Sequence, residues 1–509
     1  FVVQEVDQDG KLTPKYYKIV LKTNEIGTSE AIKWSTDADG ATGSVEVKLP
    51  NSDIPTKLYY TVDESKYNPI LGTRLTDLTA DVGSATKKVL FKDLNQTSAS
   101  SKVEGGAIYN SSEGGYNIYA DFIGNYTSSS NSRYNYSKGG AIYNNEGIIG
   151  NITGDFIGNY ASSASYYSDG GAIYNFGTIG DITGDFVGNY AFSSSAASNI
   201  GGGAIYNLRV LGNITGDFIG NYASSAASST TQGGAIHNYL TIGDITGNFI
   251  GNYASSSQSY GGAIYNSGTI GNISGDFIGN HASFSIFSYG GAIYNYENGT
   301  IGNITGDFIG NYASATYSST SYSNYANGGA IYNYGTIGNI TGDFIGNYAS
   351  SAYSVYSKYS YTVGGAIYNS RGTIGNITGD FVGNYAKSET GEAGGGAIYN
   401  IGRIGNITGD FIGNYASSAY SVYSRYSDNK DNASGGAIRN SGTIGNIIGD
   451  LIGNYVSATA TATNSSSAAY GGAIYNYGTI DNISGDLIGN YVSATATATN
   501  SSSAAYGGA

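Results

Sequence analysis

Apolar residues recur along this chain in two short phrases that are separated by glycine and asparagine. A six-residue phrase, Gly-Gly-Ala-Ile-Tyr-Asn, opens at Gly105 and recurs to Gly471, and each copy is followed by a second phrase, Phe-Ile-Gly-Asn. Twelve such pairs fill the chain from Gly105 onward, and a thirteenth begins at Gly507. A fixed phrase at a period of roughly 30 to 40 residues indicates a solenoid, in which each unit contacts only its neighbours.

One repeat, residues 139–159, shows which elements the pattern predicts. Its three extended stretches are Ala141–Asn144, Ile148–Thr153 and Asp155–Asn159. Glycine and asparagine separate the stretches and tolerate the positive φ values that corners need. Frequent glycine and β-branched residues disfavour helix. We therefore predict an all-β fold, a right-handed parallel β-helix of about twelve coils, with stacked coils about 4.8 Å apart.

Substitutions within the repeats indicate which side chains point inward. The Ile of Ala-Ile-Tyr never changes, and the Phe of the second phrase changes only to Leu451 and Leu487. The Tyr of Ala-Ile-Tyr is replaced by His237 and by Arg439, and an unpaired Arg is costly in a dry core. We therefore expect this Tyr ladder to face solvent and to be a candidate partner-binding surface. Its members are Tyr109, Tyr143, Tyr174, Tyr206, Tyr265, Tyr294, Tyr332, Tyr368, Tyr399 and Tyr475.

A change of composition near residue 103 predicts a domain boundary. Thirteen of the 23 Lys and Arg, all four Pro and the single Trp lie before it. We predict a β-rich N-terminal cap or connector domain at residues 1–103, and the β-helix at residues 104–509. Extended runs at residues 16–23, 43–49, 57–62 and 88–94 predict strands.

The incomplete phrase at Gly507 predicts that the β-helix continues beyond Ala509 in the natural protein. The absence of Met predicts that Phe1 is a processed or excerpted start.

An aspartate precedes the Phe of the second phrase in nearly every repeat. A repeated acid is typical of a structural or electrostatic feature, whereas a catalyst needs one asymmetric site. We therefore expect no enzymatic activity and no required cofactor. Neighbouring carboxylates about 4.8 Å apart repel one another, so calcium bridging them is an alternative to simple solvation. The candidate cation ladder is Asp155, Asp185, Asp217, Asp276, Asp307, Asp343, Asp380 and Asp410.

Charge and hydropathy narrow the classes of partner. The formal net charge is −14, whereas nucleic-acid binding favours a basic stripe. The chain has no run of 18 or more apolar residues, so no membrane-spanning helix is predicted.

Coils differ in length mainly between Asn-Tyr-Ala-Ser and the next Gly-Gly, so the insertions emerge from one corner. Such one-sided insertions often mark a binding face, and their Tyr and Ser suit adaptable contacts; solvated loops without a partner are the alternative.

The paired phrases resemble a known family. The pairing of Gly-Gly-Ala-Ile, as at residues 105–108 and 139–142, with Phe-x-x-Asn, as at 122–125 and 156–159, is similar to the chlamydial polymorphic membrane proteins. More broadly it resembles the β-helical passenger domains of autotransporter-type surface proteins. The resemblance covers about four fifths of the chain, and implies a passenger that is secreted and displayed at a cell surface, often in adhesion. The chain departs from the family in its more uniform repeats, in having no Cys, and in showing no C-terminal membrane barrel.

Two functions from different classes follow. The first is a secreted or cell-surface adhesin or passenger that presents Tyr- and Ser-rich faces to a glycan or protein. The second is a structural protein that assembles with copies of itself, end to end, into extracellular filaments, because an open β-helix end is an unpaired edge. The family resemblance favours the first, and the uniformity of the repeats favours the second.

Overall fold

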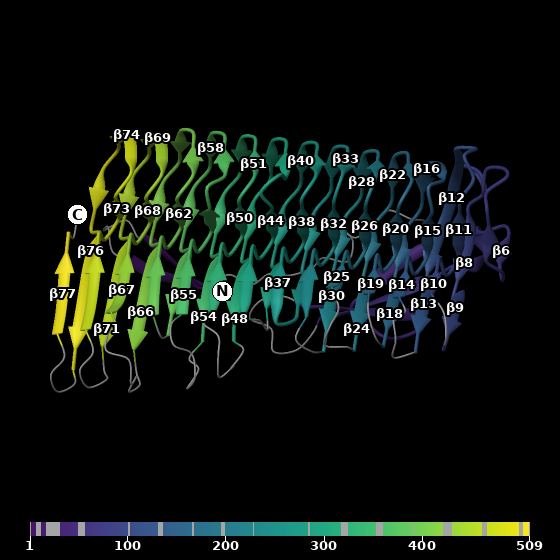
Figure 1. Ribbon diagram of the computed structural model, residues 1–509, viewed down its shortest axis with the longest axis horizontal. Coiled ribbons are helices and arrows are strands. Elements are labelled where there is room, and N and C mark those ends of the chain that lie inside the picture. The colour runs from purple at the N-terminus through teal and green to yellow at the C-terminus, as the bar shows by residue number, and fades with distance from the viewer. Residues whose placement is uncertain are drawn as a thin grey trace. The chain divides into compact units, whose positions relative to one another are not determined.

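The chain folds as a parallel β-solenoid of about twelve turns in the computed structural model, with a small β-rich region at its N-terminus, and this confirms the predicted fold class (Figure 1). The structure describes residues 2–6, 12–16, 31–48, 56–99, 102–130, 136–164, 167–194, 199–226, 229–283, 286–316, 324–352, 360–389, 391–420, 430–460, 466–497 and 502–507. Contacts divide the chain into two compact units. Unit 1 comprises residues 1–18, 257–260 and 277–509, and unit 2 comprises residues 19–256 and 261–276.

A single turn of unit 2 shows how one repeat folds. Its strands are β14 (Tyr136–Lys138), β15 (Ile142–Asn144), β16 (Ile148–Thr153), β17 (Phe156–Ile157) and β18 (Tyr160–Ser163). Each strand pairs in parallel with the same part of the next repeat, so that Phe156 lies opposite Phe186 and Tyr160 opposite Tyr190. Every motif position therefore forms a ladder of equivalent side chains.

Unit 1 repeats this arrangement. Its strands β47 (Phe308–Ile309) and β53 (Phe344–Ile345) pair in parallel, with Phe308 opposite Phe344. Strands β50 (Ile331–Asn333) and β56 (Ile367–Asn369) pair in the same way, with Ile331 opposite Ile367. Because the motif is the same, the register is the same in both units.

Two strands of each turn were missing from the sequence prediction. They are the Ser-rich strand that follows Gly-Asn, as in β18, and the strand before Gly-Gly, as in β14 or β19 (Tyr167–Asp169). Serine and alanine carry little intrinsic strand preference. These segments form strands because each pairs in parallel with the corresponding segment of the neighbouring turn.

Stacked aromatic rings occupy the interior of each unit. In unit 2 the rings of Phe122 and Phe156 lie 4.7 Å apart and within 5° of parallel, and in unit 1 those of Phe308 and Phe344 lie 4.7 Å apart. These Phe side chains are fully buried, as predicted for a core ladder. Full burial of one Phe contributes roughly 2–3 kcal/mol before conformational entropy is subtracted.

Two buried asparagine ladders close the corners. Asn159 Nδ2 donates to Asn189 Oδ1 of the next turn at 2.9 Å and to the Phe122 carbonyl of the previous turn at 2.9 Å. The second ladder follows Ala-Ile-Tyr, where Asn144 Nδ2 donates to Asn175 Oδ1 at 3.0 Å. Burying an amide costs free energy unless it is bonded, so these contacts explain why only asparagine occupies the position.

The N-terminal region has two parts within unit 2. The first is an antiparallel sheet of order β3-β5-β4, made of β3 (Ile32–Ser35), β4 (Gly43–Val47) and β5 (Thr56–Val62). The second comprises β6 (Ile70–Leu71), β7 (Leu75–Thr76), β8 (Val89–Lys92), β9 (Asn95–Ser98) and β10 (Val103–Glu104). This second part adds a turn below the first repeat, since β7, β8, β9 and β10 each pair in parallel with strands of the repeats. Parallel pairing of the solenoid type therefore begins before the predicted boundary at residue 103.

Three of the predicted N-terminal strands are present as β4, β5 and β8. Of the fourth, residues 17–23 lie outside the described residues, and Tyr16 ends β2 (Leu12–Tyr16). In unit 1, β2 pairs antiparallel with β1 (Val2–Val6).

Candidate functional site

The aspartates before Phe form a ladder whose carboxylates hold the backbone of the next turn. The Asp155 amide donates to Asp121 Oδ1 at 2.8 Å, and the Asp185 amide donates to Asp155 Oδ1 at 2.9 Å. The same contact joins Asp343 to Asp380 in unit 1, where the distance is 2.8 Å. Asn248 keeps the pattern, because its Oδ1 accepts from the Asp276 amide at 2.9 Å. A carboxylate oxygen and a carboxamide oxygen can both accept a hydrogen bond from the backbone amide of the next turn. This structural contact accounts for the repeated position without a catalytic role.

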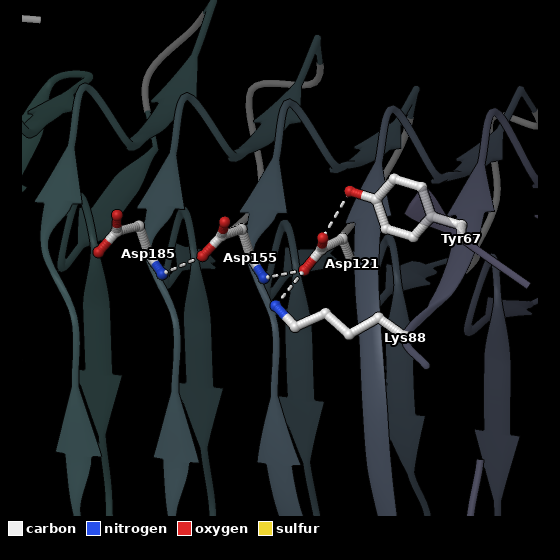
Figure 2. Close-up of polar contacts among 5 residues, drawn as sticks. All are labelled: Tyr67, Lys88, Asp121, Asp155 and Asp185. Atoms are coloured by element: carbon white, nitrogen blue, oxygen red, sulfur yellow. Dashed lines mark hydrogen bonds and ion pairs between the residues drawn. The ribbon is translucent and has the colours of Figure 1, made fainter. Parts of the chain in front are cut away.

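The start of this ladder brings together several ionisable side chains, shown in Figure 2. Asp121 is fully buried. Its Oδ2 accepts from the Tyr67 hydroxyl at 2.6 Å, and its Oδ1 lies 3.1 Å from Lys88 Nζ. Asp155 and Asp185 follow in the next two turns. One lysine therefore faces three carboxylates.

Burial shifts the protonation of this row. Desolvation, followed by the charges of Asp121 and Asp185, raises the pKa of Asp155 to about 7. Desolvation also raises the pKa of Asp185 to about 6. The pKa of Asp217, one turn further, is raised by the same cause. Asp155 and Asp185 therefore change their charge at a higher pH than exposed aspartates do.

The sequence missed this cluster, because Tyr67 and Lys88 lie in the N-terminal region, outside the repeated phrases. The one available signal was Asp121, which precedes Phe122 in the first repeat as Asp155 precedes Phe156. Among the described residues, no three His, Cys, Asp or Glu side chains form a group that could hold a metal ion. The predicted calcium ladder therefore gains no support from the geometry.

The Tyr ladder of Ala-Ile-Tyr does not face solvent as predicted. Tyr143 is 6% exposed and Tyr174 is 4% exposed. Their rings stack 5.1 Å apart, and Lys138 covers Tyr174, with Nζ 4.3 Å from the ring centre and 2.8 Å from the hydroxyl. The buried members are Tyr143, Tyr174, Tyr265, Tyr294, Tyr368 and Tyr399, and the half-buried ones are Tyr109, Tyr206, Tyr332 and Tyr475.

The exposure prediction was wrong because the fold accommodates both of the substitutions that supported it. Arg439 is paired with Glu392 and lies 4.7 Å from the centre of the Tyr399 ring. His237 is 1% exposed and packs between Tyr206 and Tyr265, at 4.7 and 4.6 Å. A partner carboxylate in one turn and a neutral ring in the other make both residues tolerable in a buried ladder.

A second Tyr ladder follows Gly-Asn and is half-buried in most turns. The rings of Tyr160 and Tyr190 stack 4.7 Å apart in unit 2, and those of Tyr348 and Tyr385 stack 4.8 Å apart in unit 1. Because each ring face meets the next ring, a ligand would reach only ring edges and hydroxyls. Sugar stacking on a ring face therefore requires tyrosines outside this ladder.

Turn length varies most in one connection. The connection follows the Ser-rich strand after Gly-Asn and precedes the strand before Gly-Gly. It is residues 256–257 between β36 (Tyr253–Ser255) and β37 (Gln258–Tyr260), and residues 352–359 between β54 (Tyr348–Ser351) and β55 (Ser360–Val363). The predicted one-sided insertions therefore fall between the same two strands in every turn.

No helix within the described residues is long and apolar enough to cross a membrane. No family model, curated protein or solved structure matches the chain.

Proposed function

We propose that this protein is a non-enzymatic, secreted or cell-surface β-solenoid of the adhesin or passenger type, which binds a glycan or protein partner through its variable connections. One observation carries the proposal: a strictly repeated scaffold varies in length mainly between the same two strands of each turn. Binding residues commonly lie on loops that a rigid scaffold positions.

The composition of these connections supports a binding role. Residues 353–359 read Tyr-Ser-Val-Tyr-Ser-Lys-Tyr, and residues 421–429 contain Tyr423 and Tyr426 among Ser, Arg and Asp. Tyrosine supplies a large contact area with few rotatable bonds, and serine supplies adaptable hydrogen bonds. The ladder tyrosines differ, since their ring faces are occupied by their neighbours. Partner contacts through rings are therefore assigned to the connections.

The non-enzymatic part of the proposal rests on the aspartate ladder. Its carboxylates are repeated, and each described contact gives the carboxylate oxygen a backbone amide to accept from. An acid that serves the same structural contact in turn after turn is a poor candidate for a catalytic group.

Binding of residues 1–509 to a glycan array and to cultured cells tests the proposal. We expect binding that falls at least tenfold when Tyr353, Tyr356, Tyr359, Tyr423 and Tyr426 are replaced together by Ser. A matched control replaces Tyr239 and Tyr296, which are exposed elsewhere, and is expected to bind normally. Equal loss in both variants, or no binding by the wild-type chain, would contradict the proposal. Negative-stain electron microscopy across concentrations separates the alternative, because regular filaments would make self-assembly the better explanation.

A further inference from the structure

We propose that the N-terminal sheet β3-β5-β4 is a pH-sensitive cover on one face of unit 2, held tightly in mildly acidic solution and loosened as the pH rises past neutral. The proposal is independent of the adhesin function. It rests on a row of half-buried carboxylates that runs beside the apolar contact between the sheet and the turns.

The sheet packs on the outward-facing residue that follows Phe in successive turns of unit 2. Val45, Val47 and Leu58 of the sheet are buried in one cluster with Ile157, Val187 and Ile219 of the turns. The contact is close: a Cβ added at Gly188 would lie 2.1 Å from Val45 Cγ1. At Gly220 an added Cβ would lie 3.1 Å from Val47 Cγ2. Nearby residues of β4 thus contact adjacent turns, and the sheet closes off this part of the face.

The carboxylate row runs beside this apolar contact. Asp155 and Asp185 lie two residues before Ile157 and Val187, which the cover buries. A desolvated carboxylate is disfavoured in its charged form, and a row of like charges one turn apart adds repulsion. The charged and titratable groups that act on the row are Tyr67, Lys88 and Asp121, which Figure 2 shows, and Asp217 one turn further. Asp63 acts on Tyr67. Lys88 is the one cation among them.

The direction of the pH effect follows from the raised pKa values. Removing the cover returns water to the row, so the pKa of Asp155 falls from about 7 toward its ordinary value of 3.8. Between pH 5 and pH 8 the covered state therefore holds more protons than the uncovered state, and lower pH favours the cover. Each unit of pKa difference corresponds to about tenfold in the docking equilibrium. We expect opening to increase at least tenfold from pH 5.5 to pH 8.5.

The chain contains a reporter confined to the cover. Its single tryptophan, Trp34, lies in β3, packs against the buried cluster, and meets the Tyr60 ring at 5.4 Å. Selective excitation of Trp34 in the full chain, with acrylamide as quencher, measures how often the cover opens. Amide hydrogen exchange of β3, β4 and β5, corrected for the intrinsic pH dependence, gives an independent measure.

We expect quenching of Trp34 and exchange of the sheet amides to rise together above pH 7. Asp155→Asn keeps the Oδ1 acceptor, as Asn248 does, and removes the charge, so it should flatten most of this pH dependence. Asp343→Asn in unit 1 is the matched control and should leave the Trp34 profile unchanged. A cover equally protected at pH 5.5 and 8.5, or an Asp155→Asn profile identical to wild type, would overturn the proposal.

Discussion

The same repeated motif occupies two different environments in the two units. In unit 2 the residue after Phe is covered by the N-terminal sheet, so that Val187 and Ile219 are fully buried, whereas in unit 1 Ile309 and Ile345 are only half-buried. The backbone is the same in both: the glycines after Ile219 and Ile345 have φ of 61°. The repeat therefore fixes the backbone and the inward side chains, while a segment outside the repeats decides the surroundings of the outward ones.

The largest predicted effect tests what the units share. Asn221→Ala leaves the Asn189 amide without an acceptor and the Phe186 carbonyl without its Asn221 donor. Unpaired buried groups cost about 1–3 kcal/mol each, so we expect a loss of about 4 kcal/mol. Asn347→Ala in unit 1 should cost the same, because Asn311 and Phe308 depend on it in the same way. Urea unfolding followed by amide exchange measures both, and a difference above about 2 kcal/mol would show that the ladders are not equivalent.

The next prediction tests how the units differ. Ile219→Ala creates a cavity beneath the cover, and we expect it to destabilise unit 2 by about 3 kcal/mol. Ile345→Ala removes a half-buried side chain and should cost unit 1 about 1 kcal/mol. The same denaturation measurement applies. Equal costs would mean that the N-terminal sheet adds nothing to the burial of this ladder.

His237 gives unit 2 a pH response of the opposite sign to that of its aspartates. Burial lowers the pKa of His237 to about 3, and neither ring nitrogen has a hydrogen-bond partner among the described residues. Between pH 6.5 and pH 3, His237 is therefore protonated in the unfolded chain but neutral in the folded chain. The free energy of unfolding falls as the pH drops through this range. His237→Tyr, which restores the residue of the ladder, should gain about 2 kcal/mol at pH 5 and little at pH 7.5. Thermal unfolding at the two pH values checks this, and an equal change at both would refute it.

The smallest prediction isolates the contact of the cover. Gly158 and Gly188 have φ of 62° and 63°, so alanine strains the backbone by about 1 kcal/mol at either. An added Cβ meets nothing within 4 Å at Gly158 but meets Val45 at Gly188. We expect Gly188→Ala to cost about 1 kcal/mol more and to increase the quenching of Trp34, whereas Gly158→Ala leaves Trp34 unchanged. Matching Trp34 signals would show that β4 does not depend on this close approach.

The sequence predicted the core ladders well, because every turn carries nearly the same residues at the same motif positions. A nearly unchanged Ile or Phe across the repeats signals a position whose neighbours above and below are copies of itself, and the buried Ile and Phe ladders confirm this. The Ser-rich strands were missed because their strand conformation comes from pairing between turns rather than from the preference of serine.

The tyrosine ladder shows where the argument from substitutions failed. Arg439 and His237 were interpreted as signs of exposure, yet Glu392 pairs with the first and stacked rings enclose the second. Glu392 precedes Arg439 by 47 residues, so no local pattern indicates the pair. Compensation of this kind becomes visible only when neighbouring turns are placed side by side.

The sequence by itself determined the parallel solenoid, its register and its core, because a period of identical residues has one way to stack identical side chains. Only the tertiary structure decided that the N-terminal sheet lies against the turns of unit 2, and that Tyr67 and Lys88 meet Asp121 there. The physical reason is that a repeat specifies contacts with its own copies. Its contacts with a non-repeating segment depend on shape and burial, and neither follows any period of the chain.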